Sequence, residues 1–168
     1  MDKIGLGGGC HWCTEGVFQT LKGVLKVEQG WIASIDPYNT FSEGVVVHFD
    51  SQIINLSTLV SIHLHTHSCT SDHDFRNKYR SAIYTFNDRQ IVEAKAATLS
   101  AQEDFEGTII TKVIPFDKFK LNQESYLNYY RNNPDKPFCQ TYIDPKIKLL
   151  MDKFYTHVKS KKTSTLTS

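Results

Sequence analysis

The segment with the clearest structural pattern is Ile4-Gly5-Leu6-Gly7-Gly8-Gly9-Cys10-His11-Trp12-Cys13, close to the start of the chain. Its first half is a short apolar strand that ends in glycines, which let the backbone turn tightly and approach a ligand closely. Residues 10–18 then follow a helical pattern, with Trp12 and Phe18 on its apolar side. The sequence therefore predicts a strand, a glycine turn and a helix, with Cys10 at the helix N-terminus.

The predicted position of Cys10 favours a thiolate. Unpaired backbone amides and the positive end of the helix dipole both stabilise a negative charge in the first turn of a helix. Cys13 completes a Cys-x-x-Cys motif, which can close a redox disulfide or supply two thiolates to a metal ion. Both thiols could also be small buried core residues, and spacing alone leaves these alternatives open.

Strands and helices alternate along the rest of the chain. We expect strands at 24–32, 44–49, 79–86 and 108–114, and helices at 55–67, 88–105, 123–131 and 145–159. The strict βαβ rhythm of a doubly wound sheet is missing. We therefore expect one α+β domain over residues 1–159, with a mixed or antiparallel sheet flanked by helices, and a disordered tail over 160–168.

Composition narrows the classes of function. The chain has 168 residues, of which 40% are hydrophobic and 22% charged, a balance that excludes an intrinsically disordered protein. The formal net charge of +1 gives no field that recruits nucleic acid. No apolar run approaches the roughly 20 residues of a membrane helix, and no signal peptide is visible, so we expect no membrane association and a reducing, cytoplasmic compartment. Four cysteines are too sparse for a disulfide scaffold and suggest redox chemistry or metal binding.

Three histidines provide the material for an alternative function. His63 and His67 are one helical turn apart, with His65 between them, and together with Cys10 and Cys13 they could bind zinc. In that case the chain would be a zinc-binding or inactive interaction module. A third possibility is a thiol-disulfide oxidoreductase that uses the Cys-x-x-Cys motif alone.

A thiolate that attacks a polar substrate needs a proton donor aimed at the atom that gains charge. Glu43 precedes a strongly apolar strand, where partial burial favours the protonated acid. Asp74 and Tyr79 could add a fixed acceptor and a hydroxyl donor.

Taken together, these residues resemble the peptide methionine sulfoxide reductase A family, whose members act on the S epimer of the sulfoxide. Four blocks match the family's motifs in order: Gly8-Gly9-Cys10-His11-Trp12-Cys13-Thr14-Glu15, Gly23-Val24-Leu25-Lys26-Val27-Glu28-Gln29-Gly30-Trp31, Tyr79-Arg80-Ser81-Ala82-Ile83-Tyr84, and Tyr126-Leu127 through Asn133-Pro134 to Phe138-Cys139. The resemblance covers nearly the whole chain and implies a ferredoxin-like core. It also implies catalytic roles for Cys10, Glu43, Asp74 and Tyr79, and substrate-binding roles for His11, Trp12 and Tyr38.

The chain departs from the family's pattern at three places near the expected site, one of which is a shortened loop, Asp72-His73-Asp74, in place of Gln-Gly-Asn-Asp. His11 stands where the family has phenylalanine, which puts a titratable ring into an apolar position. The family's Gly-x-Thr-Gly-His-Ala segment before Glu43 is missing, and a shorter loop, Tyr38-Asn39-Thr40-Phe41-Ser42, takes its place.

The resemblance implies an oxidoreductase of the peptide-methionine (S)-S-oxide reductase type, which repairs methionine after oxidative stress. Cys10 would become a sulfenic acid, and a second cysteine would resolve it to a disulfide, with Cys139 the first choice, Cys13 the second and Cys69 the third. Thioredoxin, or dithiothreitol in vitro, would reduce the disulfide. The expected substrates are oxidised proteins or free methionine sulfoxide, with no metal and no bound cofactor. A monomer is expected.

Overall fold

The structure is a computed structural model that describes residues 1–72, 76 and 78–159. Asp74 and the expected tail over 160–168 lie outside the described residues. The strands are β1 (Asp2–Gly7), β2 (Val24–Ala33), β3 (Ser42–Phe49), β4 (Ala82–Thr85), β5 (Lys112–Pro115) and β6 (Lys118–Leu121). The α-helices are α1 (His11–Gln19), α2 (Leu56–His65), α3 (Asp88–Ala101), α4 (Tyr129–Asn132) and α5 (Asp144–Lys153).

The strands form one mixed sheet in the order β5-β4-β1-β3-β2-β6. Neighbouring strands are antiparallel except β4 and β5, which are parallel and are joined through α3. The segment from β1 to β4 runs βαββαβ, with spatial order β4-β1-β3-β2, which is the ferredoxin-like arrangement. The predicted α+β class with a mixed sheet flanked by helices is confirmed.

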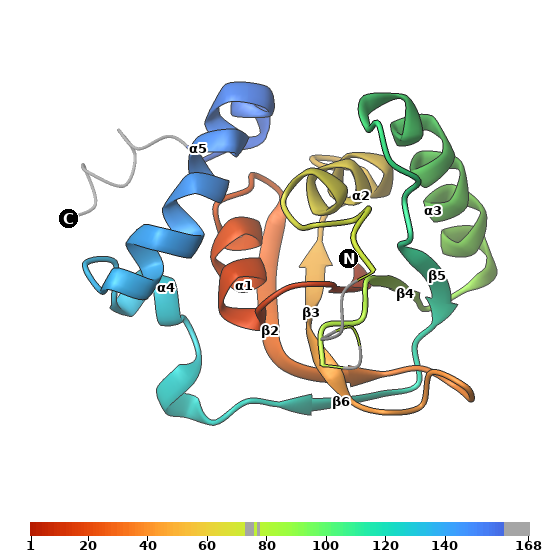
Figure 1. Ribbon diagram of the computed structural model, residues 1–168, viewed down its shortest axis with the longest axis horizontal. Helices are drawn as coiled ribbons and strands as arrows, with labels where there is room; N and C mark the ends of the chain where they lie inside the picture. The colour runs from red at the N-terminus through yellow and green to blue at the C-terminus, as the bar shows by residue number, and fades with distance from the viewer. Residues whose placement is uncertain (73–75, 77, 160–168) are drawn as a thin grey trace.

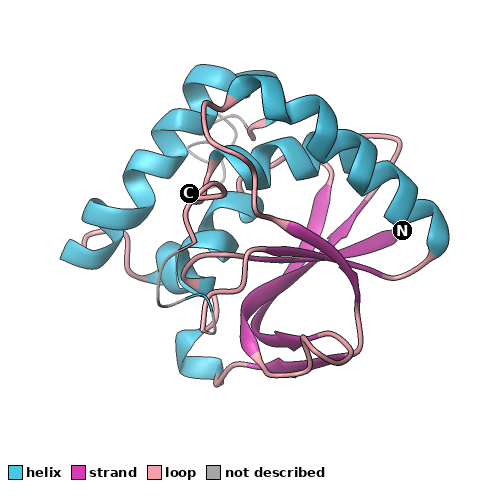
Figure 2. Ribbon diagram, turned by 45° about the vertical axis from the view of Figure 1, so that its right-hand side comes forward, coloured by secondary structure: helices cyan, strands magenta, loops and turns pink. Residues whose placement is uncertain are grey.

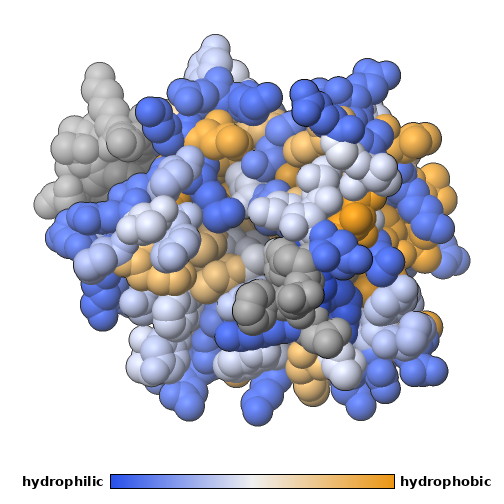
Figure 3. Space-filling model, in the orientation of Figure 1, coloured by the Kyte–Doolittle hydropathy of each residue, from blue (hydrophilic) through white to orange (hydrophobic). Residues whose placement is uncertain are grey.

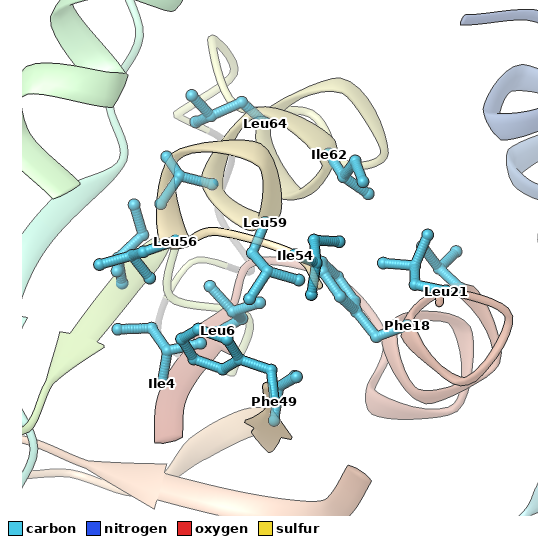
Figure 4. Packing of buried hydrophobic residues seen from close by; sticks show 14 of the residues in the cluster. Ile4, Leu6, Phe18, Leu21, Phe49, Ile54, Leu56, Leu59, Ile62 and Leu64 are labelled. Atoms are coloured by element: carbon cyan, nitrogen blue, oxygen red, sulfur yellow. The ribbon is translucent and has the colours of Figure 1, made fainter. Parts of the chain in front are cut away.

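Helices α1, α2 and α3 cover one face of the sheet (Figures 1 and 2). Alternate residues of β1, Ile4 and Leu6, point into this layer, because successive side chains of a strand face opposite sides. They meet Phe18 of α1 and Leu59 of α2 in the main core (Figure 4). Burying such side chains stabilises the fold by roughly 1.5–3 kcal/mol each.

A second, smaller core lies on the opposite face of the sheet. It is built on Ile32, Val46 and Tyr84, and the partly buried Tyr38 packs against it. Both faces of the central strands are therefore buried, which agrees with their nearly continuous apolar runs.

Asparagine side chains fix where two of the helices begin. Asn55 Oδ1 accepts a hydrogen bond from the Thr58 backbone N–H at 2.8 Å, and Asn87 Oδ1 accepts one from the Gln90 N–H at 2.9 Å. Each bond satisfies one of the amide groups that a helix start leaves unpaired. Asparagine is among the residues most favoured at this position of a helix.

The second half of the chain is less regular than its periodicity indicates. The strand expected at 79–86 is Ala82–Thr85, the strand expected at 108–114 is Lys112–Pro115, and β6 was not predicted. The helix expected at 123–131 is a 3₁₀ turn, Glu124–Tyr126, followed by the single turn of α4. The helices expected at 88–105 and 145–159 end at Ala101 and Lys153. Short elements of this kind are decided by tertiary contacts more than by local propensity.

The surface seen in Figure 3 is mainly hydrophilic, with apolar residues gathered on the right over α3 and β5. Val92 and Leu99 of α3 are among the exposed apolar side chains. Within the described residues, no helix combines the length and the apolar character needed to cross a bilayer.

Candidate active site

The glycine turn between β1 and α1 is held in place by two histidines of the α2 region. His63 Nε2 donates to the Gly7 carbonyl at 2.7 Å. The φ angle of Gly8 is +141°, a conformation that disfavours side chains, and a Cβ placed there would lie 2.5 Å from His67 Cδ2. The turn therefore needs glycine at position 8, and it delivers Cys10 to the start of α1 as its N-cap residue, as the sequence predicts.

These contacts give the histidines a structural role in place of the zinc site considered above. His67 contacts the His63 carbonyl through Nδ1 and Ser81 Oγ through Nε2. His65 contacts the Ser61 carbonyl through Nδ1 at 2.7 Å. Burial lowers the pKa of His63 to about 4, so its ring is neutral at pH 7. Among the described residues, the three histidines do not form a metal-binding group with Cys10 and Cys13.

Cys10 is held as a thiolate by hydrogen bonds from its own helix. Its pKa is lowered to about 4, first by the hydrogen bond from the Cys13 thiol and against the effect of burial. The nearby His11 side chain and the backbone N–H groups of Cys13 and Trp12 lower it further. The same contact raises the pKa of Cys13 well above its usual range. Cys10 is therefore the thiolate of this pair and Cys13 its protonated partner.

The low pKa of Cys10 predicts alkylation that hardly depends on pH. The thiolate fraction is nearly complete above about pH 5, whereas for an ordinary thiol it changes tenfold per unit below a pKa of roughly 8.5. We expect the rate at which iodoacetamide alkylates Cys10 to stay constant between about pH 5 and pH 8. Peptide mass spectrometry measures this rate. Cys13→Ala should restore a rising rate, because it removes the first cause of the shift. A tenfold rise per pH unit in the unmodified chain would contradict the thiolate.

Glu43 lies next to Cys10 because β1 and β3 are paired in register. Gly7 at the end of β1 faces Gly44, so Glu43 at the start of β3 reaches the first turn of α1. Its side chain is only 6% exposed. Oε1 accepts the His11 backbone N–H at 3.2 Å and lies 3.1 Å from His11 Nδ1, while Oε2 lies 3.4 Å from Lys78 Nζ. His11 and Lys78 thus fix the position of the carboxyl group, which also lines the pocket described next.

Cys10 and Glu43 line an open pocket of about 410 Å³, and aromatic rings form much of its wall. Trp12 stacks on Tyr129, with ring centroids 4.1 Å apart and planes at 11°, and Tyr126 stacks beside it at 5.5 Å. Trp31, which pairs with Glu43 across β2 and β3, lies edge-on to His11 at 5.3 Å. Such a pocket suits an apolar group attached to a polar atom.

A buried glutamate supports this aromatic wall. Glu15 is 1% exposed, and its Oε2 accepts the Asn128 backbone N–H while its Oε1 accepts that of Tyr129. Oε1 also accepts Gln29 Nε2 at 2.9 Å. The carboxylate therefore fixes the start of α4, and with it the ring on which Trp12 stacks. Glu15 stands one helical turn from Trp12, but no sequence pattern predicts this role for it.

The other predicted site residues divide into three groups. Tyr79 lines the pocket together with His11, Trp12 and Glu43. Tyr38 packs against the core on the opposite face of the sheet and is not among the described residues that line the pocket. Tyr126, which was not predicted to bind substrate, lines the pocket instead. Asp74 lies outside the described residues.

The four cysteines lie in two places. Cys10, Cys13 and Cys139 share one apolar cluster, whereas Cys69 belongs to the main core. Cys139 follows a segment rich in proline and asparagine, but it begins a π-helical turn, Cys139–Ile143, and is fully buried. The turn places Cys139 against the Cys13 side of α1.

Comparisons with known proteins agree with this geometry. The family model described as "Peptide methionine sulfoxide reductase" matches residues 2–159. The "Peptide methionine sulfoxide reductase MsrA" of Acinetobacter baumannii (strain SDF) is 32% identical over 168 residues, which covers 92% of this chain and 96% of the relative.

Solved structures show the same fold. The reduced form of Mxr1 from Saccharomyces cerevisiae superposes with a TM-score of 0.74 at 21% identity, covering 84% of this chain and 90% of that one. Mxr1 in complex with Trx2 gives a TM-score of 0.61 at 21% identity, covering 73% of this chain and 81% of that one.

Proposed function

The chain belongs to the peptide methionine sulfoxide reductase family, and we propose that it reduces the S epimer of methionine sulfoxide with Cys10 as the nucleophile. The observation that carries this proposal is the Cys10 thiolate beside the buried Glu43 carboxyl, in a pocket walled by aromatic rings. A methionine sulfoxide side chain has the matching chemistry, because it joins an apolar methyl group to a polar S–O group.

In the proposed reaction, the oxygen passes from the substrate sulfur to the Cys10 sulfur. The thiolate attacks, the substrate S–O bond breaks, and methionine leaves while Cys10 becomes a sulfenic acid. Substrate sulfur gains two electrons and Cys10 loses two. Glu43, in its protonated form, supplies the proton to the sulfoxide oxygen, and the Tyr79 hydroxyl donates a hydrogen bond to it.

The aromatic residues would hold the substrate methyl group. Trp12 offers a ring face beside Cys10, and Tyr126 takes the place in the pocket that the resemblance gave to Tyr38. For Asp74 the proposal rests on the family motif alone. The substrate would be methionine sulfoxide, free or in oxidised proteins.

We propose Cys13 as the first resolving thiol, ahead of Cys139. Cys13 already hydrogen-bonds to Cys10, so it can attack the sulfenic acid, form the Cys10–Cys13 disulfide and release water. Cys139 is in the same cluster and can then exchange into this disulfide at Cys13, which frees the Cys10 thiolate. Cys69 lies in the main core and has no part in this relay.

A relay predicts how much methionine forms without any reductant. A chain with Cys10, Cys13 and Cys139 should release two methionines, because Cys10 is freed once and then oxidised again. Cys139→Ser should release one. We would count methionine by chromatography after mixing reduced protein with excess sulfoxide. One methionine from both proteins would contradict the relay, and would leave Cys13 or Cys139 as the sole resolving thiol.

The external reductant would be a dithiol protein of the thioredoxin type. The structural neighbour Mxr1, solved in complex with Trx2, supports this proposal. Dithiothreitol would replace this partner in vitro. The proposed catalytic groups are all side chains, and the reaction balances without a metal ion or organic cofactor.

The function is tested by turnover of the two sulfoxide epimers. With dithiothreitol as reductant, we expect reduction of S-epimer dabsyl-methionine sulfoxide and no reduction of the R epimer. Insulin disulfide reduction, measured in parallel, tests the thiol-disulfide oxidoreductase alternative. Exchange activity with no sulfoxide turnover would contradict the proposed function and favour that alternative.

A further inference from the structure

We propose that Cys10, His11 and Glu43 form a binding site for Zn²⁺ or a similar thiophilic divalent cation, which blocks the catalytic centre when occupied. This trio is the candidate metal-binding group among the described residues. One ligand atom from each residue lies within 4.8 Å of the other two. Thiolate, imidazole and carboxylate are the three ligand types that zinc takes from proteins.

The surroundings of the His11 ring indicate a ligand that is not part of the protein. Its side chain is 8% exposed, and Nδ1 has no hydrogen-bond partner among the described residues. Glu43 Oε1 lies 3.1 Å away, but that contact does not have hydrogen-bond geometry. A buried polar atom without a partner is costly, and a metal ion next to the carboxylate would satisfy it.

The ring is also held in a fixed orientation. Trp12 stacks on His11 with centroids 5.8 Å apart, and Trp31 lies edge-on at 5.3 Å. Asn122 Nδ2 donates a long hydrogen bond, at 3.4 Å, to His11 Nε2, so the neutral ring carries its proton on Nδ1, and a metal ion bound there would replace that proton. Pre-oriented ligands lose little entropy when a metal binds.

The geometry needs only a small closure. In a tetrahedral zinc site, with bonds of about 2.0–2.3 Å, neighbouring ligand atoms are about 3.5 Å apart. In the Cys10–His11–Glu43 group, His11 Nδ1 and Glu43 Oε1 are already 3.1 Å apart, and all three ligand atoms lie within 4.8 Å of one another. Lys78 Nζ, 3.4 Å from Glu43 Oε2, competes for the carboxylate, but its side chain is 62% exposed and can turn away. The open pocket leaves the fourth position to water.

A bound metal ion would hold both the proposed nucleophile, Cys10, and the proposed proton donor, Glu43, so neither could take part in the reaction. Binding uses lone pairs of sulfur, nitrogen and oxygen and releases only the protons that these atoms carry, so a chelator should reverse it. The inhibition rests on the proposed function, whereas the metal site does not. His11 is the residue that completes the trio, at a position where the resembling family has phenylalanine.

The test uses Co²⁺ as a spectroscopic probe and needs no enzyme assay. In a Cys13→Ser/Cys69→Ser/Cys139→Ser chain, Cys10 is the only thiol, so a thiolate-to-cobalt charge-transfer band can come only from Cys10. We expect this band to saturate at one Co²⁺ per chain, and Zn²⁺ to displace it. His11→Phe and Glu43→Gln, each added to that chain, should weaken Co²⁺ binding by about tenfold or more.

His48→Phe in the same background is the matched control. His48 Nε2 contacts Glu28 Oε1 at 2.6 Å, so this variant also removes one histidine of a histidine–glutamate pair. It should leave Co²⁺ affinity unchanged. Equal affinity in the His11→Phe chain would overturn the site. A band that the unmodified chain shows and the Cys13→Ser/Cys69→Ser/Cys139→Ser chain lacks would also overturn it, in favour of a Cys-x-x-Cys metal site. Circular dichroism checks the fold, and if His11→Phe misfolds, Glu43→Gln decides. Cobalt binding by a chain that does not reduce sulfoxide would sink the proposed function and leave the metal site standing.

Discussion

Replacing Cys10 with serine is expected to lower turnover of the methionine sulfoxide S epimer by about 10⁴-fold or more, to the level of the assay background. The reason is chemical as well as electrostatic. The contacts that hold Cys10 as a thiolate cannot ionise a hydroxyl group to a useful extent, and a serine oxygen cannot take up the sulfoxide oxygen as sulfur does. Steady-state reduction of dabsyl-methionine sulfoxide measures the effect.

Cys69→Ala is the matched control for this substitution. It removes a thiol that lies in the main core, away from the cluster of the other three. We expect it to keep most of the turnover at a temperature where circular dichroism shows the chain folded. Comparable losses from Cys69→Ala and Cys10→Ser would mean that the assay reports stability, and the assignment of Cys10 would fail.

The second large effect is expected for Glu43→Gln. An amide cannot donate a carboxylic proton to the sulfoxide oxygen, so kcat should fall by about 10²- to 10⁴-fold, the usual contribution of general acid catalysis. The substrate should still bind, because the aromatic wall of Trp12 and Tyr126 is unchanged. KM should therefore change much less than kcat.

Glu28→Gln provides the comparison for Glu43→Gln. Glu28 also belongs to the sheet and pairs with a histidine, His48, but it does not line the Cys10 pocket. Its replacement should leave kcat close to that of the unmodified chain. The acid role of Glu43 is contradicted if Glu43→Gln keeps its kcat and only KM rises.

The sequence predicts the centre of the site well, because local pattern determines it. The strand, glycine turn and helix around Cys10 follow from apolar spacing and from the backbone freedom of glycine, and they place the thiol at a helix start. Glu43 was expected at the start of a strand, and it is the second residue of β3. Its contact with His11 depends on the β1–β3 register, which apolar alternation favours but does not specify by itself.

The sequence did not predict the positions of residues that depend on contacts between distant parts of the chain. Tyr126 follows β6, a four-residue strand that reaches the site by pairing with β2, and such a short segment has no clear periodicity. Tyr38 is directed to the other face by the short loop after β2, where the cations of Arg80 and Lys112 lie over its ring. Cys139 follows a stretch rich in proline and asparagine that indicates a loop, yet the chain turns back onto α1 and buries it.

Glu15 illustrates a different limit of the sequence. Its place in a helix is evident, but a glutamate on a helix surface is usually solvated, and only the fold shows that it caps the start of α4. The aromatic wall therefore depends on a buried carboxylate as much as on apolar packing. This coupling links the family motif around Cys10 to the segment that carries Tyr129.

A reductant-free single turnover with Cys10 as the only thiol tests whether Cys10 accepts the sulfoxide oxygen. The Cys13→Ser/Cys69→Ser/Cys139→Ser chain, fully reduced, is mixed with excess S-epimer sulfoxide and with dimedone, which traps sulfenic acids. We expect one methionine per chain and one dimedone adduct, located at Cys10 by peptide mass spectrometry. No methionine from a folded chain, or methionine formed while Cys10 stays unmodified, would contradict Cys10 as the oxygen acceptor.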